Sequence, residues 1–263
     1  MLSEIGIRLF QPGSHAGRAV DTPPEPPRQA GGKPAATTGV ARTPAPVVYA
    51  PAALPSPVLS SHLAGIDALD WEALGSAVVG CSACKLCNGR RNAVTGTGDP
   101  QADWMVVGDP PDENEDMQGT PFAGDAGQLL DNMLRAIGAD RSKGAYITNV
   151  LKCRPAGNRN PDAEELAQCE HFLRRQVALV QPRVILAMGR FAVQSLLQTT
   201  DPIGKLRGRV HQYNGVPVVV TFHPVHLLRN LPDKARAWTD LCLAMAAIEA
   251  GPAALPQGEG SGL

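Results

Sequence analysis

The sequence lacks an excess of charge of either sign, a long apolar run and a recognisable secretion signal. Its 263 residues carry a formal net charge of −1, so any binding to nucleic acid must come from a local patch rather than from the chain as a whole. The lack of a long apolar run excludes a membrane-spanning helix. The apolar start contains Glu4 and Arg8 and has no cleavage site, so it is not a secretory signal. We therefore expect a cytoplasmic protein without a membrane partner.

Residues near the start of the chain also lack a periodic apolar face. Eleven of the 24 prolines lie between Pro12 and Ser61. This composition buries too little apolar surface to offset the entropy lost on ordering, which predicts disorder. We expect a disordered Pro/Ala-rich segment with a short apolar start over residues 1–65, a folded domain over residues 66–250 and a disordered tail over residues 251–263.

Short apolar runs and amphipathic stretches alternate through the expected domain. The predicted strands lie at residues 105–107, 146–150, 184–188 and 216–222. The predicted helices lie at residues 67–79, 127–137, 162–179, 190–197 and 234–248. This alternation is typical of an α/β fold in which helices cover both faces of a parallel sheet.

A long acidic loop rich in Pro and Gly follows the first predicted strand. It starts at Gly108 and ends where an amphipathic helix opens near Ala126. Open α/β sheets bind ligands beyond the carboxyl ends of their strands, so a loop of this length at that edge favours a ligand site. A solvated connector without function is the alternative.

The cysteines form a pattern that suits metal binding. In a reducing compartment, six cysteines are better explained as metal ligands or buried thiols than as disulfides. Cys81 and Cys84 form a Cys-x-x-Cys pair on one turn, Cys153 follows a strand, and Cys169 lies in the next helix. Four thiolates suit either zinc or an iron–sulfur cluster, and spacing alone does not choose between them. Cys87 is a fifth candidate, and unrelated buried thiols are the alternative.

Two polar residues follow predicted strands at the same edge of the sheet. Asn149 ends one strand, and its amide offers an acceptor and two donors that match the edge of a pyrimidine. Asn at a strand end also commonly caps a turn. His223 ends the fourth strand; a lone His is more often structural, but the following Pro224 and Leu-Leu-Arg run favour a functional role.

A local basic patch surrounds His223. Between Ile203 and Arg236 there are six Lys or Arg residues and one acid, which suits contact with phosphate. Leu227 and Leu228 within this patch suit a wedge that pushes a base out of a duplex. The same pair also fits the pattern of core leucines.

A series of motifs occurs in a specific order between about Asp70 and Ala247. The motifs are Cys81/Cys84, the Gly108 loop, Gln118–Phe122, Ala126–Leu130, Tyr146–Asn149, Lys152–Pro155, Cys169 and His223-Pro with Leu227–Asn230. In this order they resemble family 4 uracil-DNA glycosylases, the iron–sulfur branch of the uracil-DNA glycosylase superfamily. The resemblance implies a three-layer α/β/α sandwich with a central four-stranded parallel sheet. It also implies a [4Fe–4S] cluster with a structural role on Cys81, Cys84, Cys153 and Cys169, with zinc as the alternative and Cys87 outside the ligand set.

The resemblance also implies roles for the residues of the pocket. Phe122 would stack on a uracil flipped out of DNA, Asn149 would bind its pyrimidine edge, and Glu115 would narrow the pocket against a thymine methyl group. Gly108 would line the base site. His223 would donate to the uracil O2 oxygen as the glycosidic bond breaks, which is electrostatic stabilisation of the leaving group. Water would then add to the sugar and leave an abasic site.

The Gly108 loop departs from the family pattern. The family usually has Gly-Glu-Ala-Pro-Gly where this chain has Gly108-Asp-Pro-Pro-Asp112. Asp109 keeps the carboxylate but shortens it by one methylene, and Asp112 replaces a glycine that can require a backbone conformation costly for other residues. We expect Asp109 to position the water, with Asp112 as its rival. The departure leaves a second hypothesis, a catalytically weak nucleic-acid-binding relative of the same fold.

The expected partner is uracil-containing DNA, bound by a monomer. The expected DNA contacts are Arg207, Leu227, Leu228 and Arg229. The apolar start of the N-terminal segment is either a frayed terminus or a docking peptide for a repair or replication protein.

Overall fold

The computed structural model describes residues 65–251. The expectations for residues 1–64, including the disordered segment and its docking role, lie outside the described residues. So does the expectation of a disordered tail over residues 252–263.

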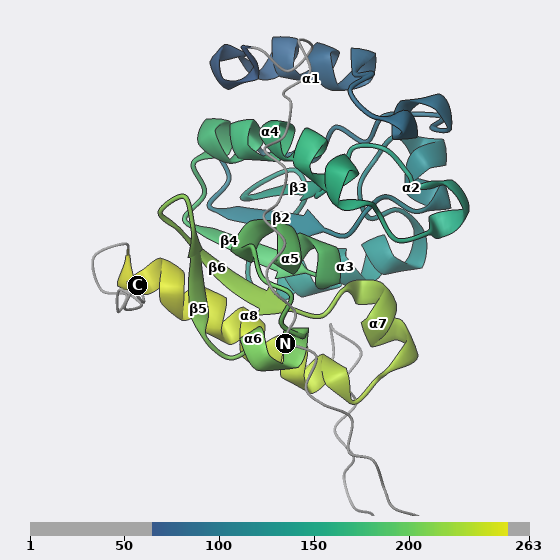
Figure 1. The fold of residues 1–263 in the computed structure, drawn as a ribbon. Helices are drawn as coiled ribbons and strands as arrows, with labels where there is room; N and C mark the ends of the chain where they lie inside the picture. Colours follow the sequence, from purple (N-terminus) through teal and green to yellow (C-terminus); the bar gives the residue numbers. More distant parts are fainter. Residues whose placement is uncertain (1–64, 252–263) are drawn as a thin grey trace, which may run out of the picture. The chain divides into compact units, whose positions relative to one another are not determined.

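A six-stranded sheet with the order β1-β3-β2-β4-β6-β5 forms the centre of the fold (Figure 1). The strands are β1 (Thr97–Gly98), β2 (Trp104–Gly108), β3 (Ala145–Asn149), β4 (Val184–Met188), β5 (Val210–Tyr213) and β6 (Val216–Thr221). The four central strands are parallel and correspond to the four predicted ones, whereas both edge strands are antiparallel to their neighbours. The prediction of a four-stranded sheet missed these edges because β1 has only two residues and polar residues interrupt β5.

Helices cover both faces of the sheet. The helices are α1 (Trp71–Gly80), α2 (Glu113–Gln118), α3 (Gly124–Ala136), α4 (Ala163–Val180), α5 (Arg190–Leu197), α6 (Ile203–Leu206), α7 (Pro224–Arg229) and α8 (Asp233–Ala250), with short 3-10 helices η2 (Ile66–Ala68), η3 (Lys85–Asn88) and η4 (Ala156–Asn158). No helix in this part of the chain is long and apolar enough to cross a membrane.

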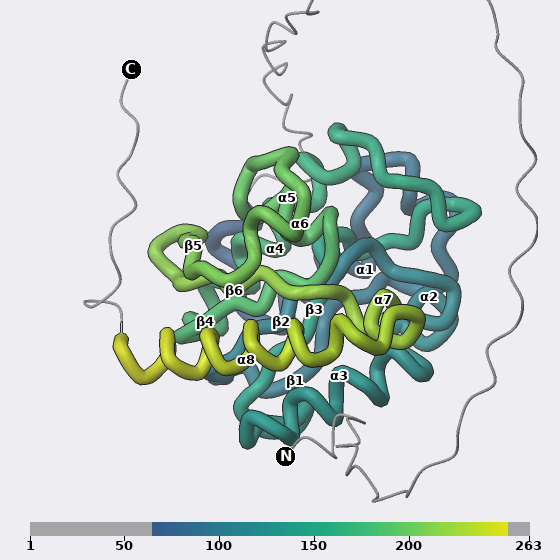
Figure 2. Tube along the Cα trace, turned by 90° about the horizontal axis from the view of Figure 1, so that it is seen from below, coloured from purple at the N-terminus to yellow at the C-terminus, as the bar shows by residue number. Residues whose placement is uncertain are grey.

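Alternate strand residues build two separate cores, because successive side chains of a strand point to opposite faces. Val106 packs in one core with residues of α3 and α8. Met105 and Val107 pack in the other with residues of α4 and α5. Figures 1 and 2 show α3 and α8 on one side of the sheet and α4, with α1 beyond it, on the other. The result is a three-layer α/β/α arrangement.

Capping side chains decide where two of the helices begin. Asp162 and Glu165 form a capping box at the start of α4. Asp112 and Glu115 form the same device at the start of α2. The short acidic stretch was predicted to be loop, so α2 is a correction.

Candidate functional site

The carboxyl ends of four adjacent parallel strands bring the expected site residues to one edge of the sheet. Gly108, the last residue of β2, pairs in register with Asn149, the last residue of β3. On its other side Gly108 pairs with Met188 of β4, which pairs with Thr221 of β6. His223 follows two residues later as the N-cap of α7. The Gly108 loop, Asn149 and His223 therefore share one edge.

Asn149 presents a buried acceptor that has no partner. Its side chain is 0% exposed, and its Nδ2 donates to the backbone carbonyl of Asp109 at 2.8 Å and to Oε1 of Glu115 at 3.1 Å. Both partners are acceptors, which fixes the orientation of the amide. Within the described residues, Oδ1 of Asn149 has no hydrogen-bond partner. Because buried polar atoms are rarely left unsatisfied, this oxygen is suited to an incoming N–H group.

Glu115 is a buried carboxylate that joins three parts of the site. Oε2 accepts from the backbone N–H of Asp112 at 2.7 Å, and Oε1 accepts from the backbone N–H of Phe122 as well as from Asn149. Burial raises the pKa of Glu115. Both oxygens are thus engaged with protein donors, and Glu115 ties the start of α2 to Phe122 and Asn149.

The ring of Phe122 lies against the end of β2 and beside His223. A Cβ added at Gly108 would lie 2.5 Å from Cζ of Phe122, so only glycine allows the ring to approach the strand this closely. The rings of Phe122 and His223 are stacked with centroids 5.0 Å apart and an interplanar angle of 17°. Ring planes in contact are about 3.5 Å apart, so the two rings are offset sideways and part of the Phe122 face extends beyond the imidazole.

His223 has the tautomer of a hydrogen-bond donor. Its Nδ1 accepts from the backbone N–H of Val225 at 3.3 Å, so in the neutral ring the proton is on Nε2. Burial lowers the pKa of His223 to about 4, which keeps the imidazole uncharged near neutral pH. The Nε2–H group can therefore donate a hydrogen bond without a positive charge on the ring.

Asp109 supplies the cap of a helix from a different part of the chain. Its Oδ1 accepts from the backbone N–H of Phe191 at 2.8 Å and of Ala192 at 3.1 Å, at the start of α5. The N-cap residue Gly189 has no capping side chain, and a Cβ there would overlap the Asp109 carboxylate. Burial raises the pKa of Asp109 to about 6. The positive end of α5 favours the ionised form of this carboxylate against that burial.

Asp112 is not strained, contrary to the concern that the sequence raised. Its φ is −90° and its ψ is −171°, an ordinary extended conformation. Its Oδ1 accepts from the backbone N–H of Glu115 at 2.9 Å and so caps α2. The replacement of the family's glycine at this position is therefore compatible with the fold and contributes a helix cap.

The expected wedge pair is divided between core and surface. Leu227 is 1% exposed and packs in the core between α3 and α8, so the alternative of a core leucine is the correct one for this residue. Leu228 is 42% exposed and Leu231, just beyond α7, is 62% exposed. Leu228 and Leu231 are thus exposed apolar side chains at the end of α7 and just beyond it. Leu231 was not predicted, because it follows the motif that carries the resemblance.

Arg207 is committed to contacts within the protein. Its Nε donates to Oδ2 of Asp240 at 2.7 Å, and Nη2 donates to the carbonyl of Arg236 at 2.7 Å. The guanidinium also lies 4.3 Å from the centroid of the Phe222 ring. These contacts favour a structural role for Arg207, and its expected contact with DNA stays a prediction. Arg229, in the last turn of α7, lies on the exposed surface.

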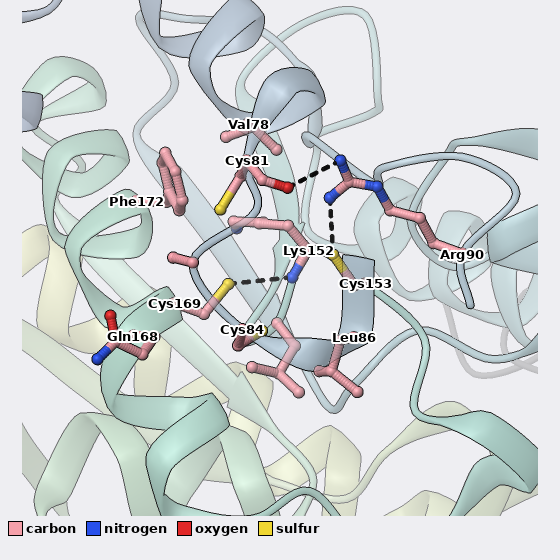
Figure 3. A pocket seen from close by; sticks show the side chains of 12 residues that line it. Val78, Cys81, Cys84, Leu86, Arg90, Lys152, Cys153, Gln168, Cys169 and Phe172 are labelled. Atoms are coloured by element: carbon pink, nitrogen blue, oxygen red, sulfur yellow. Dashed lines mark hydrogen bonds between the residues drawn. The ribbon is translucent and has the colours of Figure 1, made fainter. Parts of the chain in front are cut away.

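Four of the cysteines surround one pocket (Figure 3). Cys81, Cys84, Cys153 and Cys169 all line it, and its empty volume, including the part open to solvent, is about 320 Å³. Cys87 is not among the lining residues. The pocket therefore selects the same four thiols as the family pattern and leaves out the fifth.

Hydrogen-bond donors face two of these sulfur atoms. Nη1 of Arg90 donates to Sγ of Cys153 at 3.0 Å, and the backbone N–H of Lys152 donates to Sγ of Cys169 at 3.3 Å (Figure 3). Donors of this kind suit thiolate ligands. Over residues 65–251, no three His, Cys, Asp or Glu side chains form a group that could hold a single metal ion. The four thiols are of the type that binds either a zinc ion or an iron–sulfur cluster.

Comparison with known proteins gives the family. The sequence model of the uracil DNA glycosylase superfamily matches residues 95–244. The type-4 uracil-DNA glycosylase of Thermotoga maritima is 41% identical over 167 residues, which are 63% of this chain and 86% of that protein. The chain belongs to the uracil-DNA glycosylase superfamily, in its type-4 branch. The type-4 enzymes of Archaeoglobus fulgidus and Saccharolobus solfataricus are 39% and 36% identical, over 57% and 66% of this chain and 79% and 85% of those proteins.

Two residues that shape the site of this type-4 family member were missed from the sequence. Arg141, in the turn between α3 and β3, donates to the carbonyl oxygens of Pro121 and Phe122. Gly127 lies where a Cβ would overlap the carbonyl oxygen of Phe122. Arg141 contacts backbone atoms far away in the sequence, and no pattern of residue types reveals such a contact. Gly127 stands in the Ala126–Leu130 motif and at the start of the predicted helix, but its residue type does not reveal the contact with the Phe122 carbonyl.

Proposed function

We propose that the chain excises uracil from DNA by hydrolysing its N-glycosidic bond and leaving an abasic site. The observation that carries this proposal is the buried, unpartnered Oδ1 of Asn149 at the edge where Phe122 and His223 stack. The type-4 branch of the family supports the same reaction.

Asn149 would select the base through its free acceptor. The N3–H group of uracil is a donor that can satisfy Oδ1, whereas N3 of cytosine carries no hydrogen. Since Nδ2 is held by Asp109 and Glu115, the amide cannot reverse to suit cytosine without losing both hydrogen bonds. A buried polar group left unpaired costs about 1 to 3 kcal/mol, which disfavours the wrong base.

Phe122 and His223 would act together on the flipped base. A pyrimidine stacked on the part of the Phe122 ring that extends beyond the imidazole would lie in nearly the same layer as His223. Nε2–H of His223 could then donate to the uracil O2. As the bond between C1′ and N1 breaks, its electron pair moves to the base, and this hydrogen bond stabilises the resulting anion.

Asp109 would position the water that attacks C1′ and accept its proton. The carboxylate is held by the start of α5 through Oδ1, and its pKa of about 6 allows it to be ionised at neutral pH. Asp112 is the weaker candidate because its side chain caps α2. The unstrained backbone at Asp112 removes the main argument for a catalytically weak relative.

DNA would be held beside α7. Leu228 and Leu231 form an exposed apolar pair next to Arg229, which suits a wedge that enters the base stack while a cation faces the phosphates. Pushing the base out of the stack is required before it can reach a buried pocket. Uracil-containing DNA is therefore the proposed partner.

Cys81, Cys84, Cys153 and Cys169 would hold a [4Fe–4S] cluster. The pocket that they line and the donors on two of their sulfur atoms support a metal centre on these thiolates, and the resemblance to the iron–sulfur branch favours the cluster over zinc. When bound, the cluster would supply cross-links between the segment after α1, the loop after β3 and α4, and no redox step.

The proposed activity is tested with oligonucleotides that contain one uracil. Purified protein is incubated with single-stranded and double-stranded substrates, and abasic sites are then cleaved with alkali. We expect strand breaks at the uracil position that fall by about a hundredfold in the His223→Ala variant, the usual effect of removing a donor to a developing anion. Breaks that do not exceed those of the variant would contradict the proposal.

A further inference from the structure

The main chain of Phe122 has a conformation that needs support. Its φ is +50°, in the left-handed region that bulky residues rarely adopt. The ring is 3% exposed and lies between the end of β2 and His223, so this conformation sets where its face points. Residues held in this region persist only when their surroundings impose the conformation.

Two charged side chains hold the two ends of this residue. On one side, Glu115 accepts from the N–H of Phe122. On the other, Nη2 of Arg141 donates to the Phe122 carbonyl at 2.9 Å, and Nη1 donates to the Pro121 carbonyl at 2.9 Å. The third nitrogen, Nε, donates to Oδ1 of Asp131 on α3 at 2.6 Å. One planar guanidinium thus fixes two successive carbonyls relative to α3.

The approach of α3 is matched to this contact. A Cβ at Gly127 would overlap the carbonyl oxygen of Phe122 and lie 3.1 Å from Nη2 of Arg141. Glycine therefore leaves the space in which the carbonyl and the guanidinium meet. A lysine at position 141 could offer only a point charge in place of the fork.

We infer that Arg141 is a positioning residue that holds Phe122 in the conformation needed to stack on the flipped base. The inference rests on the proposed function. Arg141 does not touch the base; it acts through the carbonyl oxygens of Pro121 and Phe122. Its loss would let Phe122 leave the left-handed region and tilt its ring away from the base, while the DNA-contacting surface at α7 stays intact.

The first test compares Arg141→Gln and Arg141→Lys with a matched control, Arg135→Gln. Arg135 is exposed in the last turn of α3, and among the described residues its side chain donates only to Asn132. We expect Arg141→Gln to lower kcat on a uracil oligonucleotide by 10- to 100-fold and to weaken inhibition by free uracil, because a shift of about 1 Å has effects of this size. KM for the oligonucleotide should stay within about twofold, since DNA is held elsewhere.

Arg141→Lys should have an intermediate effect, and Arg135→Gln should resemble the wild type. Equal kcat and equal inhibition by free uracil in Arg141→Gln and Arg135→Gln would overturn the inference. If Arg141→Gln does not fold, Asp131→Asn serves in its place. Asp131→Asn weakens only the contact of Nε, so it should lower kcat by a smaller factor than Arg141→Gln would. If the folded Asp131→Asn and Arg141→Lys proteins both have the wild-type kcat, the inference is also overturned.

A second test does not depend on activity. Glycine adopts a φ of +50° without strain, so in the Phe122→Gly background Arg141 has less to hold. Arg141→Gln should therefore lower the unfolding temperature by less in that background than in the wild type. An equal decrease of the unfolding temperature in both backgrounds would contradict the proposal that Arg141 holds Phe122 in its conformation. If the wild type releases no uracil, the proposed function fails, but this comparison still tests the contact.

Discussion

Replacing Gly127 by Ala tests whether the approach of α3 to Phe122 shapes the site. In an ordinary helix interior, Gly to Ala stabilises by about 1 kcal/mol. Here the new Cβ would lie 1.9 Å from the carbonyl oxygen of Phe122, so the carbonyl or the helix must move by more than an ångström. Overpacking of this kind costs up to about 3 kcal/mol, which leaves a net loss of about 2 kcal/mol.

The expected consequences are measurable in stability and in rate. A loss of this size lowers the unfolding temperature of a domain this large by about 4 to 8 °C. Displacing Phe122 by about 1 Å should also lower the rate of uracil release by about a hundredfold. Thermal unfolding followed by circular dichroism and a single-turnover assay measure the two effects.

Gly75→Ala is the matched control. Gly75 lies within α1, and a Cβ there meets no atom of residues 65–251 within 4 Å. The substitution should therefore stabilise by up to about 1 kcal/mol and leave the rate unchanged. If Gly127→Ala is as stable and as active as Gly75→Ala, the close approach between α3 and Phe122 does not matter and the reasoning fails.

Three further predictions concern the carboxylate, the apolar surface and the cysteines. Since burial raises the pKa of Asp109 to about 6, kcat/KM should rise with pH through about 6, and Asp109→Asn should abolish this rise. The same raised pKa means that the stability contributed by the protonated carboxyl group is lost as the pH rises from about 4 to 6. Leu231→Ala should slow excision from duplex DNA several-fold more than excision from single strands, and equal effects of this variant on both substrates would contradict the wedge. Leu227→Ala should instead destabilise the fold by about 2 to 5 kcal/mol. Protein purified without oxygen should be brown and contain about four iron atoms per chain. The Cys153→Ser variant should lose this iron and the Cys87→Ser variant should keep it. Stoichiometric zinc in colourless protein would refute the cluster.

The sequence predicted those features that depend on local patterns. The strand at residues 184–188 was predicted with its observed bounds because an unbroken apolar run is typical of a strand buried on both faces. The helix predicted from residue 162 starts one residue later in the structure, at Ala163, with Asp162 as its N-cap. The capping box of Asp112 and Glu115 has the same signature, but the acidic Pro-rich surroundings concealed the short helix α2.

Features that depend on tertiary contacts could not be predicted in the same way. Leu227 and Leu228 are adjacent in the sequence, and only the rotation of α7 decides which of them is buried. Arg207 belongs to a basic stretch, but its ion pair with Asp240 depends on the packing of α8. Arg141 acts on backbone carbonyls, which every residue possesses, so its role leaves no trace in residue types.

The most direct test of the central claim is the release of free uracil by wild-type protein and by Asn149→Ala, followed chromatographically under single-turnover conditions. We expect free uracil from the wild type and a rate lower by about 10- to 100-fold in the variant, because the acceptor proposed to bind the N3–H group is lost. Release at the wild-type rate by a folded Asn149→Ala protein, or no release by the wild type, would contradict it.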